Sequence, residues 1–413
     1  MRRRGSRRVR AIFLIALAVL VVEIPLAQQP AVAASAGVGP KRSIKCPRKA
    51  VRVRPGASIQ AAVNRHPRGT AFCLRAGVHR LTGPITPKTG DRFIGEFGAI
   101  IDGSGWKTDD PNQGLFRAHN QDIDHVVIRN LVIRNSPQRG IHAFRDHSDR
   151  WIIENNTIHG NRGGISHGNF FRIRRNIIRG NWQYGIGSFR STGSLIAGNL
   201  LTHNAVRGAE FPGDSGTSKW ALVTNTTVRR NTVRDNYGNG IWFDTGHVGI
   251  RIVGNIVRRN GLNGIFTEVG GSTLIRNNTV TGHHRGIYIS ESEDATVTAN
   301  TLANNDRGIW LFQDGNRRGE GELANNGITD NRVRVPSTPI LPGVAPHAAG
   351  LACWNLSASQ CAVYSTGRGN AFQGNAYTVP SLSGKYWGWE NTLMTWSEWR
   401  AAGQDTTGSL KAG

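Results

Sequence analysis

Two successive segments of similar sequence each have an acidic residue at the equivalent position. Asp244 lies in GIWFDTGH and Glu268 in GIFTEVG, and each follows an aromatic residue by two positions. Two carboxylates held side by side cannot both ionise cheaply, so the pKa of one of them should rise. Such a pair supplies an acid and a base in one place. A cation site and a solvated acidic ladder are the competing interpretations, and both stay open.

A lysine lies in the segment that precedes the one with Asp244. Lys219 is the only lysine between Lys107 and Lys385 in a chain that otherwise uses arginine. Burial can lower the pKa of a lysine into a range that is useful for catalysis, which arginine does not allow. Lys219 falls in the segment AVRGAEFPGDSGTSKWALVT, which also contains Glu210. A loop over a rigid scaffold often carries function, although an ordinary surface insertion would look the same.

An internal repeat indicates which elements position these residues. Each copy reads Asn-x-(Val/Ile/Leu), has a second Asn five residues after the first, and in most cases leads to a Gly-Ile pair. One copy carries His283 in place of the second Asn. Successive copies lie 20 to 32 residues apart, and the longest interval contains the Lys219 segment. The copies begin at Asn130, Asn156, Asn176, Asn199, Asn231, Asn255, Asn278 and Asn300.

The repeat predicts a solenoid of short strands. Alternating apolar runs broken by Asn and Gly are typical of strands joined by turns, and a period near 23 residues suits one coil. Equivalent residues on successive coils should then lie about 4.8 Å apart. Asn fits the sharp turns because it tolerates a left-handed backbone and its amide can bond to the next coil. We expect His283 to disturb this ladder only locally.

This register places the two carboxylates on one outer face. If Ile241 points inward, Trp242 and Asp244 face outward, and the next coil repeats the pattern. The carboxylates then lie on the order of 5 Å apart, close to the separation in a retaining glycosidase. His247, three residues after Asp244, is expected to be a solvated turn residue. An outer aromatic column, on which sugar rings could stack, would consist of Trp242, Phe266, Tyr288 and Trp310. These rings could instead be covered by a loop or stack on one another.

The two ends of the chain are expected to differ from the coils. Residues 1–34 combine basic residues, an apolar stretch and small residues, which is typical of a secretory signal peptide. Residues 35–50 form a leader and residues 51–380 the predicted solenoid, with Ser58 capping a short helix at its start. The Trp-rich tail, residues 381–413, is expected to cover the open end.

The cysteines and the charge are consistent with export. We expect disulfides Cys46–Cys73 and Cys353–Cys361, because each pair is close in sequence and brackets one end of the mature chain. The net charge of +24 would attract polyanions, although arginine on solvated faces explains it equally well. The sequence has no CxxC motif, no phosphate-binding Gly-rich loop and no second long apolar segment. It therefore predicts a monomer with no zinc site, no nucleic-acid partner and no stable membrane anchor.

From IQAAVNRHPRGTAFCLRAGVHRL through the coils to WSEWRAAGQD, the chain resembles secreted right-handed parallel β-helix proteins of the pectin-lyase-like superfamily. The resemblance implies an all-β, right-handed parallel β-helix with a substrate groove along one outer face. That superfamily includes polysaccharide lyases, hydrolases, epimerases, tailspikes and adhesins. The chain lacks the acidic calcium cluster of pectate lyases, the Asp-Asp pair of polygalacturonases and the Tyr-Gly-x-Asp-Pro-His motif of alginate epimerases.

We therefore expect a secreted, carbohydrate-active enzyme with Asp244, Glu268 and Lys219 as catalytic residues. The aromatic column and Glu210 would bind a polysaccharide, which the basic charge suggests is acidic. In hydrolysis, Glu268 would donate a proton and Asp244 would be the nucleophile or base. In elimination or epimerisation, Lys219 would remove the proton next to a uronate carboxylate. No cofactor is expected, with calcium left open. The rival prediction is a non-catalytic polysaccharide-binding or adhesin-like protein that uses the aromatic column alone.

Overall fold

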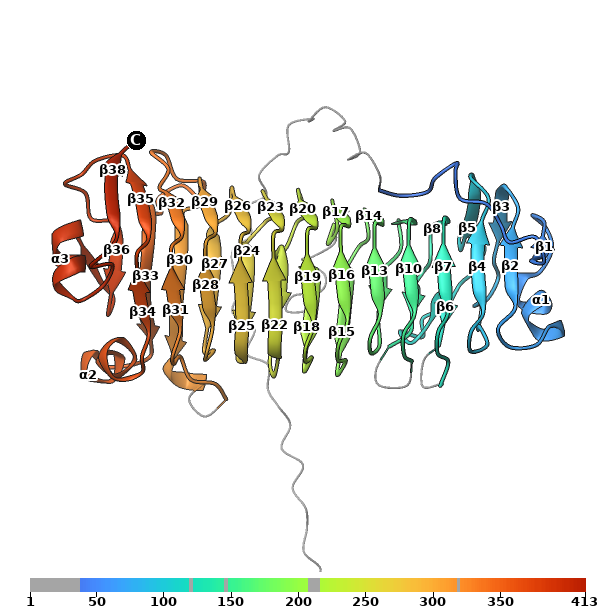
Figure 1. Ribbon diagram of the computed structural model, residues 1–413, viewed down its shortest axis with the longest axis horizontal. Coiled ribbons are helices and arrows are strands. Elements are labelled where there is room, and N and C mark those ends of the chain that lie inside the picture. The colour runs from blue at the N-terminus through green and yellow to red at the C-terminus, as the bar shows by residue number, and fades with distance from the viewer. Residues whose placement is uncertain (1–37, 119–121, 145–147, 207–215, 318–319) are drawn as a thin grey trace, which may run out of the picture.

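Three long sheets run side by side through the computed structural model (Figure 1). Figure 1 shows the strands in one long row, with the N-terminal coils at one end and the C-terminal coils at the other. The described residues are 38–118, 122–144, 148–206, 216–317 and 320–413. The predicted signal peptide and the candidate residue Glu210 lie outside them.

Sheet A has 13 described strands. In order, they are β1 (Val51–Val53), β2 (Ala71–Leu74), β4 (Arg92–Gly95), β7 (Val127–Arg129), β10 (Ile152–Glu154), β13 (Arg172–Arg174), β16 (Leu195–Ala197), β19 (Thr227–Arg229), β22 (Val248–Val253), β25 (Gly271–Arg276), β28 (Thr296–Thr298), β31 (Gly327–Thr329) and β34 (Ala371–Gln373).

Sheet B also has 13 described strands. They are β3 (Gly77–Arg80), β5 (Ala99–Asp102), β8 (Val132–Arg134), β11 (Thr157–His159), β14 (Ile177–Arg179), β17 (Leu200–Thr202), β20 (Thr232–Arg234), β23 (Ile256–Arg258), β26 (Thr279–Thr281), β29 (Thr301–Ala303), β32 (Arg332–Arg334), β35 (Ala376–Val379) and β38 (Ser409–Ala412).

Sheet C, with 12 described strands, carries the candidate site. Its strands pair in parallel, as in the other sheets, except that β36 and β37 are antiparallel. They are β6 (Gly114–Arg117), β9 (Arg139–His142), β12 (Gly163–Ser166), β15 (Tyr184–Phe189), β18 (Gly216–Ala221), β21 (Ile241–Phe243), β24 (Asn263–Glu268), β27 (Arg285–Ser290), β30 (Arg307–Asp314), β33 (His347–Trp354), β36 (Trp387–Trp389) and β37 (Thr392–Met394).

Aliphatic side chains fill the space between the sheets. In sheet C, Ile241, Ile265 and Ile287 stack on successive strands, and each is at most 1% exposed. Full burial of such a side chain is worth about 1.5–3 kcal/mol. A slip of one residue would turn the whole column outward, so this burial fixes the register of the sheet. The column is polar only where Ser218 replaces the aliphatic residue, and its hydroxyl donates to the carbonyl of Gly240 at 2.9 Å.

Asparagine side chains form a ladder at the turn between sheets A and B. The Nδ2 of Asn231 donates to Oδ1 of Asn255 at 3.0 Å, and the backbone N–H of Asn231 donates to the same oxygen at 2.9 Å. The predicted bonding of amides from coil to coil is therefore confirmed. The ladder runs through Asn156, Asn176, Asn199, Asn231, Asn255, Asn278, Asn300, Asn331, Asn375 and Asp405.

The left-handed backbone position lies one residue before each ladder asparagine, whereas Asp405 is itself left-handed, with a φ of 47°. Arg230, with a φ of 52°, precedes Asn231, and Gly254, with a φ of 65°, precedes Asn255. From Asn156 onwards the prediction that the ladder asparagines themselves are left-handed is therefore wrong. The ladder residues bond to the next coil, and the residue before each of them makes the bend.

A second ladder at the turn between sheets B and C passes through His283. Its Nε2 lies 3.1 Å from Nδ2 of Asn260, and its Nδ1 lies 3.1 Å from Oδ1 of Asn305. Burial lowers the pKa of His283 to about 4, so the ring is neutral at pH 7, and one nitrogen accepts while the other donates. His283 thus continues the ladder, and the expected local disturbance is absent at this described residue.

Short helices and the tail cover the ends of the sheets. The helix α1 (Ile59–Arg65) begins at Ser58, whose hydroxyl accepts from the backbone N–H of Ala61 at 3.1 Å, as predicted. The tail contributes β36, β37, α3 and β38, so its strands extend sheets B and C. The other described helices are η2 (Gly315–Arg317), α2 (Ala358–Ala362), η3 (Val363–Gly367) and α3 (Trp396–Ala401). Within the described residues, no helix has the length and apolarity to span a membrane.

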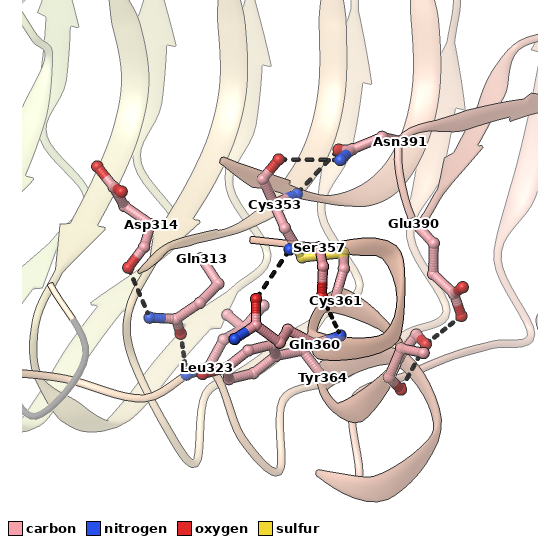
Figure 2. Close-up of a disulfide and its surroundings, with 12 residues drawn as sticks. Gln313, Asp314, Leu323, Cys353, Ser357, Gln360, Cys361, Tyr364, Glu390 and Asn391 are labelled. Atoms are coloured by element: carbon pink, nitrogen blue, oxygen red, sulfur yellow. Dashed lines mark hydrogen bonds between the residues drawn. A yellow bond between two sulfur atoms is a disulfide. The ribbon is translucent and has the colours of Figure 1, made fainter. Parts of the chain in front are cut away.

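Two disulfides brace the ends, with the pairing that the sequence predicts. Cys46 pairs with Cys73 of β2, and Cys353 of β33 pairs with Cys361 of α2. Figure 2 shows the second disulfide with Asn391 beside it. The side chain of Asn391 accepts from the backbone N–H of Cys353 at 2.9 Å and donates to its carbonyl at 3.0 Å. The disulfide ties α2 to β33, and the two hydrogen bonds of Asn391 tie the tail to the same strand.

Candidate functional site

The three candidate catalytic residues lie on adjacent coils of sheet C. Lys219 is on β18, Asp244 directly follows β21, and Glu268 is the last residue of β24. Phe243 pairs in register with Thr267, which brings Asp244 beside Glu268. The sequence thus predicts correctly that these coils are neighbours.

The predicted alternation of inward and outward side chains is also observed. Ile241 and Phe243 belong to the central core, whereas Trp242 belongs to a separate cluster of aromatic residues on the outer face. Asp244 therefore projects from the outer face of sheet C. Lys219 itself lies within a strand, so the described part of its segment is a regular piece of the sheet rather than a bulge.

Lys219 and Asp244 form an ion pair. The Nζ atom lies 3.2 Å from Oδ2 of Asp244, and the two side chains are 18% and 19% exposed. The same Nζ atom lies 4.3 Å from the ring centroid of Trp242. The other carboxylate oxygen of Asp244 accepts from the backbone N–H of Thr245 at 2.7 Å and from its hydroxyl at 3.1 Å. Both oxygens of the Asp244 carboxylate therefore have partners within the protein.

Glu268 has a different environment. The indole N–H of Trp242 donates to its Oε2 at 3.2 Å, and the guanidinium of Arg317 contacts its Oε1. Burial raises the pKa of Glu268, and the negative charge of Asp244 raises it further. Arg317 and Trp242 lower it, but the net direction is upward. Glu268 is therefore the member of the pair that is better suited to hold a proton.

Glu291 is a third carboxyl group at the site, and unlike Asp244 and Glu268 it is fully buried. The repeat does not predict it. Its side chain is 1% exposed, with one oxygen 3.6 Å from Arg317 and the other 2.9 Å from the backbone N–H of Asp314. The hydroxyl of Ser290 also donates to it. Burial is the main reason that its pKa rises to about 6.

Local geometry explains why Glu291 and Arg317 were missed. Glu291 follows the end of β27 with a φ of 43°, so counting alternate residues along the strand does not place it. Arg317 lies 49 residues after Glu268, in the helical turn η2 that follows β30. The only visible signal was the acidic run SESED after the Gly-Ile phrase of this coil.

The aromatic column exists, but its rings are not an open track. Trp242 stacks on Phe266 with ring centroids 5.7 Å apart, and Phe266 stacks on Tyr288 at 5.0 Å. Trp310 continues the column in register with Tyr288. The four residues are only 6–9% exposed. The expectation of exposed ring faces is therefore wrong, and the alternative that the rings stack on one another is observed for Trp242, Phe266 and Tyr288.

His247 is also more buried than the sequence suggests. It is 0% exposed, and its Nδ1 lies 2.8 Å from the backbone carbonyl oxygen of Asp244. Burial lowers its pKa, so it is neutral at pH 7. A Cβ atom on Gly270 would approach the imidazole to 2.3 Å, so glycine is required at that position. His247 supports the backbone at Asp244, and the prediction of a solvated turn histidine is wrong.

The described carboxylates of the site do not gather into a three-ligand cluster. Only one set of three candidate ligands lies close together within the described ranges, and it comprises Cys46, Cys73 and Glu96. Both sulfur atoms of that set belong to a disulfide. Metal-binding sulfur is the thiolate form, so this set does not fit a metal ion.

Solved structures of low sequence identity share the fold. The A-module of the Azotobacter vinelandii mannuronan C-5 epimerase AlgE6 is 13% identical, with a TM-score of 0.60 over 86% of this chain and 94% of that one. The catalytic unit of a GH87 α-1,3-glucanase from Streptomyces thermodiastaticus is 13% identical, with a TM-score of 0.57 over 86% and 69%. The periplasmic alginate epimerase AlgG is 12% identical, with a TM-score of 0.51 over 88% and 83%.

No curated protein matches the chain by sequence. The family model described as "Right handed beta helix region" matches residues 114–280 and 223–377, which together span more than half of the chain. These matches agree with the three parallel sheets and the stacked coils. The chain belongs to the right-handed β-helix family.

Proposed function

We propose that this protein is an enzyme that hydrolyses a polysaccharide on the outer face of sheet C. Glu268 would donate a proton to the leaving oxygen, and Asp244 would be the nucleophile or base. One observation carries the proposal: Asp244 is paired with Lys219 at 3.2 Å, whereas burial and Asp244 raise the pKa of its neighbour Glu268. Two adjacent carboxyl groups whose environments differ in this way can divide the roles of acid and base.

The position of Lys219 favours hydrolysis over elimination or epimerisation. The Nζ atom of Lys219 lies 3.2 Å from Asp244 and 4.3 Å from the ring centroid of Trp242, so it is held by protein groups on adjacent coils. Adjacent coils lie about 4.8 Å apart, which suits the short separation of a retaining pair of carboxylates. In this proposal Lys219 holds Asp244 in place.

The comparisons support a polysaccharide as the substrate. The epimerases and the glucanase that share the fold act on polysaccharides according to their names. Secretion is supported by the two disulfides, which are typical of exported proteins. The adhesin-like alternative loses its main support, because the aromatic rings are covered instead of forming an open track.

A product assay on neutral and uronic-acid polysaccharides, with and without calcium, tests the proposal. New reducing ends indicate hydrolysis, ultraviolet-absorbing unsaturated uronates indicate elimination, and solvent deuterium in an uncleaved polymer indicates epimerisation. Asp244→Asn and Glu268→Gln should each lower kcat at least about 100-fold, within the range of general acid–base catalysis. Asp330→Asn, an exposed acid in the turn between sheets A and B, is the matched control. Full turnover by both site variants would refute the assignment.

A further inference from the structure

A column of basic side chains lies beside the aromatic residues on the outer face of sheet C. Arg285 on β27 pairs in register with Arg307 on β30, which pairs in turn with His347 on β33. The guanidinium of Arg285 lies 4.6 Å from the ring centroid of Tyr288, and that of Arg307 lies 5.2 Å from the ring centroid of Trp310. The rings therefore hold two guanidinium groups on successive coils.

These side chains contain buried donors without partners. The Nε atoms of Arg285 and Arg307, and both ring nitrogens of His347, are buried and make no hydrogen bond within the described part of the chain. Arg285 does donate through another nitrogen to Oδ1 of Asn263 at 3.3 Å. A buried donor without a partner destabilises the protein. Three residues in one column thus have hydrogen-bonding capacity that the described part of the chain does not use.

The positive charge of this column is only partly compensated, because Asp306 is one acid beside two arginines. Asp306 is the nearby acid, but its carboxylate accepts from two backbone N–H groups at 2.5 and 3.1 Å and lies 3.4 Å from the ring of His284. Burial and the charge of Arg285 lower the pKa of Arg307. Burial and Arg307 lower that of His347 to about 4, so its ring is neutral at pH 7. An anion would remove the repulsion between the two guanidinium groups.

We infer that Arg285 and Arg307 bind the carboxylate of a uronic-acid unit, with His347 as an additional donor. The planar fork of a guanidinium matches a carboxylate through two parallel hydrogen bonds. Strand β27 is next to β24, which carries Glu268. Along the solenoid axis Arg285 therefore lies one coil, about 5 Å, and Arg307 two coils, about 10 Å, from Glu268. Across the sheet the arginines lie at the other end of the strands, because Arg285 pairs with Asn263 whereas Ser290 pairs with Glu268.

The inference rests on the proposed function and names its substrate class. A polysaccharide chain that follows the outer face of sheet C would meet the carboxyl groups of the catalytic site and then the arginines. The net charge of +24 would add long-range attraction for such a polyanion. The enzyme would then act on an acidic polysaccharide, and this column would select the acidic unit.

Equilibrium binding in the Glu268→Gln background, where turnover is blocked, tests the subsite. The ligands are a polyuronate, the same polymer after reduction of its carboxyl groups, and a sulfated polysaccharide. Arg285→Gln and Arg307→Gln should each weaken polyuronate binding by about tenfold or more, as expected for loss of a charged hydrogen bond. Arg276→Gln, an exposed arginine of sheet A, removes the same charge and should have less than about a twofold effect.

Three results would overturn the inference: unchanged polyuronate binding in both variants, an equal loss for the carboxyl-reduced polymer, or binding of the sulfated polymer alone. Arg307→Lys keeps the positive charge but loses the planar fork. A polyuronate affinity between those of the wild type and Arg307→Gln therefore supports the inference. Thermal unfolding checks that each variant is folded. If the wild type cleaves no polymer but Arg285→Gln still weakens polyuronate binding selectively, the catalytic proposal fails and the subsite stands.

Discussion

Asp244 and Glu268 are adjacent carboxyl groups that meet different cations. Lys219 contacts the first and Arg317 the second. Arg317 also approaches Glu291, so one guanidinium lies between two carboxyl groups whose pKa values are raised. Burial raises the pKa of both Glu268 and Glu291 although Arg317 lowers it. This is the condition under which a carboxyl group remains available as an acid near neutral pH.

The raised pKa of Glu291 predicts a specific pH dependence of stability. Its pKa is about 6 in the folded protein against 4.5 for the ordinary group, so the folded state binds the proton more tightly. The resulting stabilisation is present below about pH 4.5 and is lost as the pH rises through about 6, a change of about 2 kcal/mol. Urea unfolding at about pH 4 and about pH 7.5 measures it.

Glu291→Gln should remove this part of the pH dependence, because glutamine does not titrate. Relative to the wild type, the variant should gain about 2 kcal/mol between the two pH values. Glu293→Gln, an exposed neighbour two residues later, is the control and should follow the wild type. Parallel stability curves for the wild type and Glu291→Gln would contradict the prediction.

At the scale of the elements, the coil turns depend on one left-handed residue each. Glycine fills this position in some coils, as at Gly254, but Arg230 holds a φ of 52°. A left-handed backbone costs a non-glycine residue roughly 1–2 kcal/mol. The hydrogen bonds from the following ladder asparagine to the next coil offset this conformational free energy.

Arg230→Gly should therefore stabilise the protein. Relief of the left-handed strain outweighs the added backbone entropy of glycine, which leaves a gain of about 0.5–1 kcal/mol. The adjacent Arg229→Gly lies in strand β19, where glycine only weakens the strand, and should destabilise by a similar amount. Thermal unfolding of both variants provides the measurement. Equal destabilisation by the two substitutions would show that the turn carries no strain.

The sequence predicts the elements better than it predicts their contacts. The Asn repeat and the alternation around Ile241 fix the coils, because burial of one side-chain column allows a single register. The same alternation brings Lys219, Asp244 and Glu268 together. It cannot show that the aromatic rings cover one another. It also cannot locate Glu291 and Arg317, whose positions depend on a turn and on a helical segment outside the repeat.

At the scale of the whole molecule, the covered ends of the solenoid keep it from associating with other copies. The indole of Trp399 is fully buried and donates to Asp405 at 2.9 Å, and the hydroxyl of Tyr377 donates to the same oxygen at 2.7 Å. The tail strand β38 pairs with β35 and covers an edge of sheet B. An uncovered edge of this kind would present unpaired backbone groups to other chains.

Removal of residues 381–413 should convert the protein into a self-associating form. The deletion exposes the edges of sheets B and C together with buried rings such as Phe372, which contacts Trp399. Size-exclusion chromatography with light scattering should show oligomers or aggregates that grow with concentration, while the full-length chain serves as the control. A monodisperse truncated monomer with an unchanged melting temperature would show that the tail does not protect the end.

The asparagine ladder has a direction, and Asp405 gives it an end. Each amide donates one hydrogen atom to the next ladder residue on the C-terminal side. Its other hydrogen atom goes to a backbone carbonyl of the preceding coil. Asp405 accepts from Asn375 through one oxygen and from Tyr377 and Trp399 through the other, so it has acceptors only. A further coil on this ladder would require a side chain with a donor, such as asparagine, in place of Asp405.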